Sequence, residues 1–207
     1  TMMDKAALSA LHGCARELSI AFISDEIYHG LDYAFPAVSA VELGEDVTVI
    51  NSFSKYFCMT GWRVGWMVVP ETLVRTMERL QQNLSISVPT LSQIAAEAAF
   101  EGRAEMEAVK KSYVENRRIL TEGLPKVGLS HFLPADGAFY LYADVSAFTG
   151  DSLAFATRLL DAAHVATTPG VDFDPFRGRQ FLRISYAGSA DHMREAVARI
   201  GDFLARE

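Results

Sequence analysis

The sequence contains few cysteines and no long apolar run. Two cysteines, Cys14 and Cys58, occur in 207 residues, which is too few for a disulfide framework, and their spacing matches no metal site. We therefore expect two buried, reduced thiols and no bound metal. The longest uncharged stretches, such as residues 86–96, contain polar residues and are too short to cross a bilayer, so no membrane segment is predicted.

Basic segments are also absent. The 19 Lys and Arg residues are outnumbered by 26 Asp and Glu residues, which gives a net charge of −7 and argues against nucleic acid as a partner. The first 19 residues carry charges and a helical pattern throughout, unlike a signal peptide. We expect a soluble, cytoplasmic protein. Because the chain begins on Thr1 without an initiating methionine, we also expect it to be part of a longer polypeptide.

Short apolar runs alternate with amphipathic stretches in the first half of the chain. Runs at 20–23, 47–50 and 64–69 are typical of strands buried on both faces, and the helical pattern covers 4–18, 70–82, a stretch starting near 89, and 103–124. This order predicts an α/β layer with a mostly parallel sheet.

The second half has a different pattern. Its expected elements, in the order β-α-β-β-α, are 138–143, 152–163, 165–168, 181–186 and 190–205. We therefore predict a partial large domain over residues 1–105 and a small α+β domain over residues 106–207.

Asp25 and Tyr28 follow the first predicted strand. In open α/β sheets, ligands bind beyond the carboxyl ends of strands, where an aspartate can face a cationic nitrogen and a tyrosine can donate its hydroxyl. The alternative is a carboxylate that caps a turn and a tyrosine at the rim of the core.

The stretch NSFSKYFCMTGWRVG (51–65) gathers hydroxyls and cations after the second predicted strand. Ser52, Ser54 and Arg63 together suit a phosphate dianion, which a guanidinium binds through paired hydrogen bonds. A lysine with an ordinary pKa of about 10.4 is a poor nucleophile at neutral pH, but near other cations it can form a Schiff base. The alternative is that Lys55 is a surface residue and Arg63 part of an ordinary salt bridge.

Arg183 lies in the middle of the apolar strand FLRISY (181–186). Alternation places Leu182, Ile184 and Tyr186 on one side of that strand and Arg183 on the other. An arginine there is costly to bury without an anion, which a ligand carboxylate or a neighbouring acidic residue can supply.

Taken together, these residues match the chemical groups of pyridoxal 5′-phosphate with a bound amino acid. The cofactor presents a pyridine nitrogen, a phenolic oxygen, an aldehyde and a phosphate, and the substrate adds a carboxylate. Each group has one candidate partner in the sequence.

The chain resembles the carboxyl-terminal part of class I/II, fold-type I aminotransferases, the aspartate aminotransferase family. The segments that carry the resemblance are DEIY (25–28), NSFSK (51–55), GWRVG (61–65), GAFYLYADV (137–145), TTPGVDF (167–173) and FLRISYA (181–187). Their order and spacing agree with the family, and the likeness covers essentially the whole chain.

The resemblance implies a role for each candidate. Lys55 would hold the cofactor as a Schiff base and transfer the proton, Asp25 would pair with the pyridine nitrogen, and Tyr28 would hydrogen-bond the phenolic oxygen. Arg183 would bind the substrate carboxylate in a bidentate fork. The implied phosphate ligands are Ser52, Ser54 and Arg63.

Several family features have no counterpart in these 207 residues. The amino-terminal half of the family supplies the ring stacked on the cofactor, part of the phosphate site and the rest of the sheet. We therefore expect this chain to be inactive alone and to expose strand edges and apolar faces. The complete protein is expected to be a homodimer that transfers an amino group between an α-amino acid and a 2-oxo acid.

Two alternatives remain open at this point. A β-lyase or synthase of the same fold uses the same lysine, aspartate and arginines, and a sensor domain binds the cofactor without turnover. For the substrate, the absence of an evident second carboxylate-binding arginine favours a neutral or aromatic amino acid. Phe139, Tyr140 and Phe173 either line the side-chain pocket or belong to the core, and we expect structural or solvated roles for His29, His131 and His164.

Overall fold

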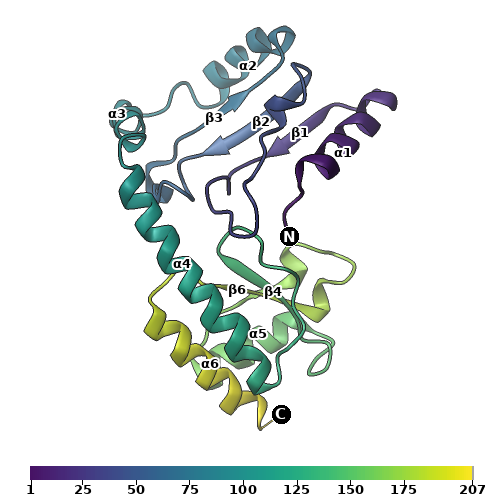
Figure 1. Ribbon diagram of the computed structural model, residues 1–207, viewed down its shortest axis with the longest axis vertical. Coiled ribbons are helices and arrows are strands. Elements are labelled where there is room, and N and C mark those ends of the chain that lie inside the picture. The colour runs from purple at the N-terminus through teal and green to yellow at the C-terminus, as the bar shows by residue number, and fades with distance from the viewer. Residues whose placement is uncertain (207) are drawn as a thin grey trace. The chain divides into compact units, whose positions relative to one another are not determined.

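The structure is a computed structural model that describes residues 1–206, which fall into two compact units (Figure 1). The first unit contains residues 2–108 and 136–138, and the second contains Thr1, residues 109–135 and residues from 139 onward. The division falls inside helix α4 (Arg103–Gly123). Residues 136–138 belong to the first unit because the Tyr33 amide donates to the Asp136 carbonyl and the Ala138 amide to the Leu31 carbonyl, both at 2.8 Å.

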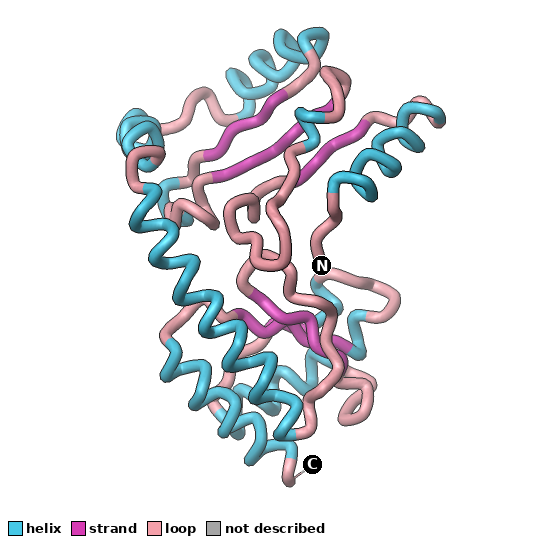
Figure 2. The backbone as a smooth tube through the Cα atoms, in the orientation of Figure 1, coloured by secondary structure: helices cyan, strands magenta, loops and turns pink. Residues whose placement is uncertain are grey.

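The first unit is built on a three-stranded sheet with the order β1-β2-β3 (Figure 2). Its elements are α1 (Lys5–Glu17), β1 (Phe22–Asp25), β2 (Val47–Ser52), β3 (Gly65–Val68), α2 (Glu71–Leu84), α3 (Thr90–Ala99) and the start of α4. Asp4 begins α1 by accepting a hydrogen bond from the Ala7 amide at 2.8 Å.

Strand directions differ within this sheet. β1 and β2 are parallel, as predicted, but β3 runs antiparallel to β2. Residues 53–64, which join β2 to β3, contain only a short 3-10 helix, Thr60–Trp62. A parallel connection needs a longer crossover, usually through a helix, so the chain returns beside β2 in the opposite direction.

β1 begins two residues later than the apolar run predicts. Ser19 adopts a left-handed backbone (φ 55°), and the Ile20 amide still donates to the Ala15 carbonyl of α1 at 2.8 Å. The end of the helix therefore occupies the first part of the run, and strand pairing starts at Phe22 opposite Val47.

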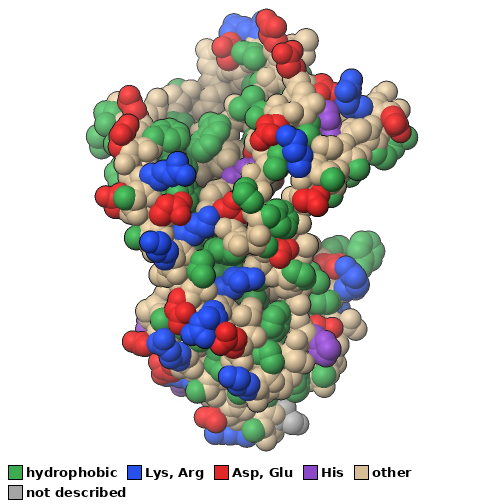
Figure 3. All heavy atoms as spheres, in the orientation of Figure 1, with side chains coloured by type: hydrophobic (Ala, Val, Ile, Leu, Met, Phe, Trp, Pro, Cys, Tyr) green, Lys and Arg blue, Asp and Glu red, His purple; other side chains and the backbone are tan. Residues whose placement is uncertain are grey.

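Apolar side chains remain exposed on the first unit. Leu8, Ala40, Val47 and Val49 form a buried cluster on the side of the sheet near α1. By contrast, Ile23 of β1 is 62% exposed, Ile50 of β2 is 38% exposed and Met67 of β3 is 50% exposed, so the prediction of burial on both faces is wrong for all three strands. The expectation that the chain leaves apolar faces uncovered is confirmed, and green hydrophobic side chains lie among interspersed charges in Figure 3.

The prediction that both cysteines are buried is wrong. Cys14 and Cys58 are both free, as expected, but both are exposed rather than buried. α1 turns Leu8 and His12 inward, and Cys14 lies away from that stripe. Cys58 lies in the loop that follows Lys55 and has a left-handed backbone (φ 56°).

The second unit is a small α+β fold. Its sheet has the order β4-β6-β5 with antiparallel pairing throughout. The elements are β4 (Tyr140–Asp144), α5 (Ser152–Ala163), β5 (Thr168–Pro169), β6 (Phe181–Ser185), α6 (Ala190–Leu204) and the end of α4. Leu182, Ile184 and Tyr186 are buried on one side of β6, as the alternation predicts.

A buried amide ties α4 to the segment after β6. Asn116 is 1% exposed, and its Nδ2 donates to the carbonyls of Tyr186 at 2.9 Å and Gly188 at 2.7 Å. Replacing Asn116 with alanine leaves two carbonyls without this donor, and we expect a loss of about 2–3 kcal/mol in unfolding free energy. Urea unfolding measures the loss, with the exposed Ser112→Ala as the control, and equal stability of both variants would contradict this role.

Candidate cofactor site

One edge of the first unit's sheet gathers several of the predicted site residues. Asp25 ends β1 and pairs in register with Ile50, two residues before Ser52 ends β2. Because β3 is antiparallel, it starts at Gly65 opposite Ser52, and this brings the preceding Arg63 to the same edge. A Cβ at Gly65 would lie 2.6 Å from the Asn51 carbonyl oxygen, so this close strand contact requires glycine.

Lys55 lies in a turn anchored on both sides by phenylalanine. Phe53 is 5% exposed, and its ring lies 4.8 Å from that of Phe57 and 4.9 Å from that of Trp66. Both phenylalanines also contact Phe100. Aromatic pairs of this kind fix ring positions, so the backbone of the Lys55 turn is held firmly at the sheet edge.

The Lys55 side chain reaches Tyr28. Lys55 Nζ lies 5.7 Å from the centroid of the Tyr28 ring, within cation–π distance. Tyr28 follows β1 in a turn closed by the Leu31 amide, which donates to the Tyr28 carbonyl at 2.9 Å. The amine and the phenol therefore belong to one neighbourhood, although they are 27 residues apart in sequence.

Ser52, Ser54 and Arg63 form a connected group of donors. The Ser52 and Ser54 hydroxyl oxygens are 2.9 Å apart, and Arg63 Nη1 donates to Ser54 Oγ at 3.5 Å and to the Thr60 carbonyl at 2.9 Å. Within residues 1–206, Arg63 forms no ion pair with a carboxylate. Two hydroxyls and an uncompensated guanidinium are suited to a phosphate dianion.

Arg63 also has an unusual backbone. Its φ of 52° and ψ of 49° place it in the left-handed region, which costs a non-glycine residue roughly 1–2 kcal/mol. Strain of this kind is concentrated at ligand-binding sites. Here it turns the guanidinium back toward Ser54.

Asp25 and Glu26 are adjacent carboxylates with different surroundings. Asp25 is exposed, and its Oδ1 accepts from the Ile27 amide at 3.3 Å. Glu26 is 3% exposed, accepts from the Ala40 amide at 2.7 Å, and lies 3.2 Å from His29 Nδ1. Asp25 is available to a ligand, whereas Glu26 fixes the turn that carries Tyr28.

The role of Glu26 was not apparent from the sequence. The only sequence signal was an acidic residue directly beside Asp25 at the end of a strand. The His29 contact with Glu26 agrees with the structural role expected for this histidine.

Arg183 lies in the second unit near two aromatic rings. Its guanidinium carbon is 4.4 Å from the Phe173 ring centroid and 5.4 Å from that of Tyr140, and Nη2 donates to Thr168 Oγ1 at 3.4 Å. No carboxylate of residues 1–206 forms an ion pair with Arg183. Both rings lie within cation–π distance of the guanidinium, and its remaining N–H groups can bind an anion. Phe173 is thus not a core residue, since it is half exposed.

Removing the Phe173 ring tests this arrangement. Phe173→Ala is expected to weaken binding of a simple carboxylate by about 3- to 10-fold, because one stacked ring no longer orients the guanidinium. Calorimetric titration with 3-methylbutanoate, which has no amino group, measures the effect. Phe176→Ala in the same loop is the control, since Phe176 is 92% exposed. A similar affinity for both variants would contradict the arrangement.

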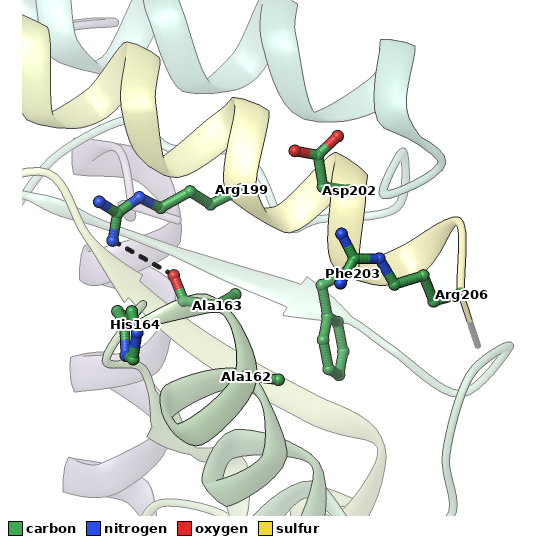
Figure 4. Close-up of a pocket in the computed structure, with 7 residues that line it drawn as sticks. All are labelled: Ala162, Ala163, His164, Arg199, Asp202, Phe203 and Arg206. Atoms are coloured by element: carbon green, nitrogen blue, oxygen red, sulfur yellow. Dashed lines mark hydrogen bonds between the residues drawn. The ribbon is translucent and has the colours of Figure 1, made fainter.

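A separate hollow of about 350 Å³ lies at the end of α5 (Figure 4). Its lining residues are Ala162, Ala163, His164, Arg199, Asp202, Phe203 and Arg206. Arg199 donates to the Ala163 carbonyl at 3.3 Å, which stabilises the carboxyl-terminal end of that helix. None of the predicted site residues lines this hollow, and it has the character of a helix-capping contact.

Comparison with known proteins decides the family. The model of the family "Aminotransferase class I and II" matches residues 1–200. The chain belongs to this family. Its members use pyridoxal 5′-phosphate, whose aldehyde, ring nitrogen and phosphate correspond to the groups gathered around Lys55. Within the described part of the chain, no group of three or more His, Cys, Asp or Glu residues is placed to bind a metal.

The relatives are enzymes and solved structures of about twice this length. Valine–pyruvate aminotransferase of Mycobacterium tuberculosis is 47% identical over 99% of this chain and 54% of its own. A solved structure from Silicibacter pomeroyi has a TM-score of 0.96 and 52% identity, over 100% of this chain and 56% of that one. A solved aminotransferase structure from Mycobacterium tuberculosis has a TM-score of 0.96 and 46% identity, and the match covers 100% of this chain and 55% of that one. The chain therefore spans about half the length of the proteins it matches.

Proposed function

We propose that these residues form part of an aminotransferase that moves an amino group between an α-amino acid and a 2-oxo acid. The observation that carries the proposal is the convergence of Lys55, the Ser52–Ser54–Arg63 donor group and Asp25 at one sheet edge. Since the chain spans about half of its relatives, we assign the activity to a polypeptide of their length and expect these 207 residues alone to be inactive.

In this proposal, Lys55 Nζ would hold the cofactor through its aldehyde carbon and, once the substrate amino group had displaced it, the freed amine would move the proton at the substrate α-carbon. The cofactor, when bound, supplies an electron sink for the charge left on that carbon. The Asp25 carboxylate would accept a hydrogen bond from the protonated ring nitrogen, and the Tyr28 hydroxyl would donate one to the phenolic oxygen. These two contacts would orient the cofactor ring and stabilise the positive charge on its nitrogen and the negative charge on its phenolic oxygen.

The anionic groups have separate partners. Ser52, Ser54 and Arg63 would bind the phosphate of the cofactor and so hold it at the sheet edge. Arg183 would bind a substrate carboxylate through its guanidinium, which lies near the Phe173 and Tyr140 rings. A bidentate contact of this kind fixes both position and orientation.

The substrates proposed are a neutral amino acid and pyruvate. Support comes from the name of the Mycobacterium tuberculosis relative, valine–pyruvate aminotransferase. We further propose a homodimer for the polypeptide of the relatives' length, as the family to which the chain belongs suggests. A cytoplasmic location is consistent with two free cysteines.

The test uses a purified polypeptide that carries these residues at the length of its relatives. It is mixed with pyridoxal 5′-phosphate, valine and pyruvate, and alanine and 3-methyl-2-oxobutanoate are quantified by mass spectrometry. Equal amounts of both products support the proposal. In a second mixture without added pyruvate, release of ammonia and pyruvate from an amino acid that carries a leaving group on its β-carbon would indicate a lyase. Cofactor binding without any product in either mixture would indicate a sensor.

A further inference from the structure

Tyr56, the residue after Lys55, is wedged between two parts of the first unit. Its hydroxyl donates to Glu107 Oε1 on α4 at 2.6 Å. On its ring side it lies against Gly30, where a Cβ would be only 2.5 Å from Tyr56 Cδ2. Gly30 has a φ of +93° and sits two residues after Tyr28, so the ring packs directly on the backbone of the Tyr28 turn.

The hydrogen bond to Glu107 persists across the physiological pH range. Burial, the hydrogen bond to the Glu107 carboxylate and its negative charge raise the pKa of Tyr56 to about 12. The phenol therefore keeps its proton at neutral pH and remains a donor to a charged acceptor, which is among the stronger kinds of hydrogen bond.

Tyr56 lies where two turns of the first unit meet. One turn carries Tyr28, the other carries Lys55, and Lys55 Nζ lies 5.7 Å from the Tyr28 ring. The Phe53 and Phe57 contacts fix the Lys55 turn toward α3 and β3, but Tyr56 is the residue of that turn that contacts Gly30. Without the link to Glu107, the phenol loses its anchor on α4.

We propose that Tyr56 and Glu107 are positioning residues that set Lys55 Nζ at its reacting distance from the cofactor aldehyde. This inference rests on the proposed function and adds two residues that have no direct contact with cofactor or substrate in it. It concerns bond formation by the lysine amine, and leaves cofactor docking through the Ser52–Ser54–Arg63 group unaffected.

Comparing two ligands distinguishes a misplaced lysine amine from general damage to the cofactor site. Pyridoxal 5′-phosphate can react with the lysine, whereas its 4′-deoxy analogue, with a methyl group in place of the aldehyde, can only dock. For Tyr56→Phe we expect about 10-fold weaker capture of the aldehyde form and a change of no more than about 2-fold for the analogue. Capture is measured by borohydride reduction and mass spectrometry of the Lys55 peptide, and analogue binding by calorimetry.

Matched variants complete the experiment. Glu107→Gln keeps an acceptor oxygen and should retain most of the capture, while Glu107→Leu should behave like Tyr56→Phe. Tyr142→Phe is the control, because Tyr142 is also a partly buried phenol with a pKa raised chiefly by burial but belongs to the second unit. Thermal unfolding of each variant verifies that it is folded.

The outcomes are distinct. The positioning role is overturned if Tyr56→Phe weakens capture of the aldehyde form and binding of the analogue equally, or if it weakens neither. The proposed function remains intact in both cases. All variants are made in a polypeptide of the relatives' length, and absence of a reducible linkage at Lys55 in its unsubstituted form overturns both.

Discussion

Replacing Lys55 with alanine is expected to lower the rate of transamination by roughly 10,000-fold or more, because one amine both bonds to the cofactor and moves the proton. The borohydride-reducible linkage should disappear as well. The rate is measured as alanine formed from pyruvate under saturating cofactor. The turn itself should persist, since Phe53 and Phe57 rather than Lys55 hold it in place.

Two further variants separate amine chemistry from loss of charge. Lys55→Arg keeps the positive charge but cannot form the same bond, and it should be as inactive as the alanine variant. Lys126→Ala removes an exposed lysine of the second unit and should leave the rate unchanged. Substantial activity in Lys55→Arg would refute the assignment of Lys55 as the reacting amine.

The second large effect is expected at Arg183. Arg183→Gln removes the guanidinium that lies near Phe173 and Tyr140, and the substrate carboxylate loses a charged, bidentate partner. We expect kcat/KM for the amino acid to fall by about 100- to 1,000-fold, in line with the loss of one member of a desolvated ion pair. Steady-state kinetics with varied amino acid at fixed pyruvate measures the change.

The control for this variant is Arg179→Gln. Arg179 lies just before β6 and is exposed, so its loss changes the net charge by the same amount without altering the strand. A comparable fall in both variants would mean that general electrostatic attraction, rather than the Arg183 fork, binds the carboxylate.

Much of the fold could be predicted because periodicity and capping residues are local signals. Helix α5 begins and ends where the pattern predicts, and Asp4 caps α1. The direction of β3 could not be predicted, since the apolar run 64–69 is the same in a parallel or an antiparallel strand. The exposure of Met67 depends on what packs on that face, which no local pattern encodes.

The candidate site was predictable to a different degree for different residues. Strand ends and unusual cations pointed to Asp25, Lys55 and Arg183, and the sheet register explains why the first two share an edge. The supporting residues were not found, because Glu26 and Tyr56 act through contacts with Ala40 and Glu107 that are distant in sequence. Such contacts become visible only when the chain is folded.

The left-handed backbone of Arg63 has a consequence for how this loop responds to substitution. A glycine there would adopt the same φ and ψ without the steric cost, and would relax the local chain by roughly 1 kcal/mol. It would also delete the only guanidinium that contacts Ser54 among the described residues. At this one position, glycine would favour stability of the chain, whereas arginine favours binding of an anion. The sequence carries the residue that favours binding.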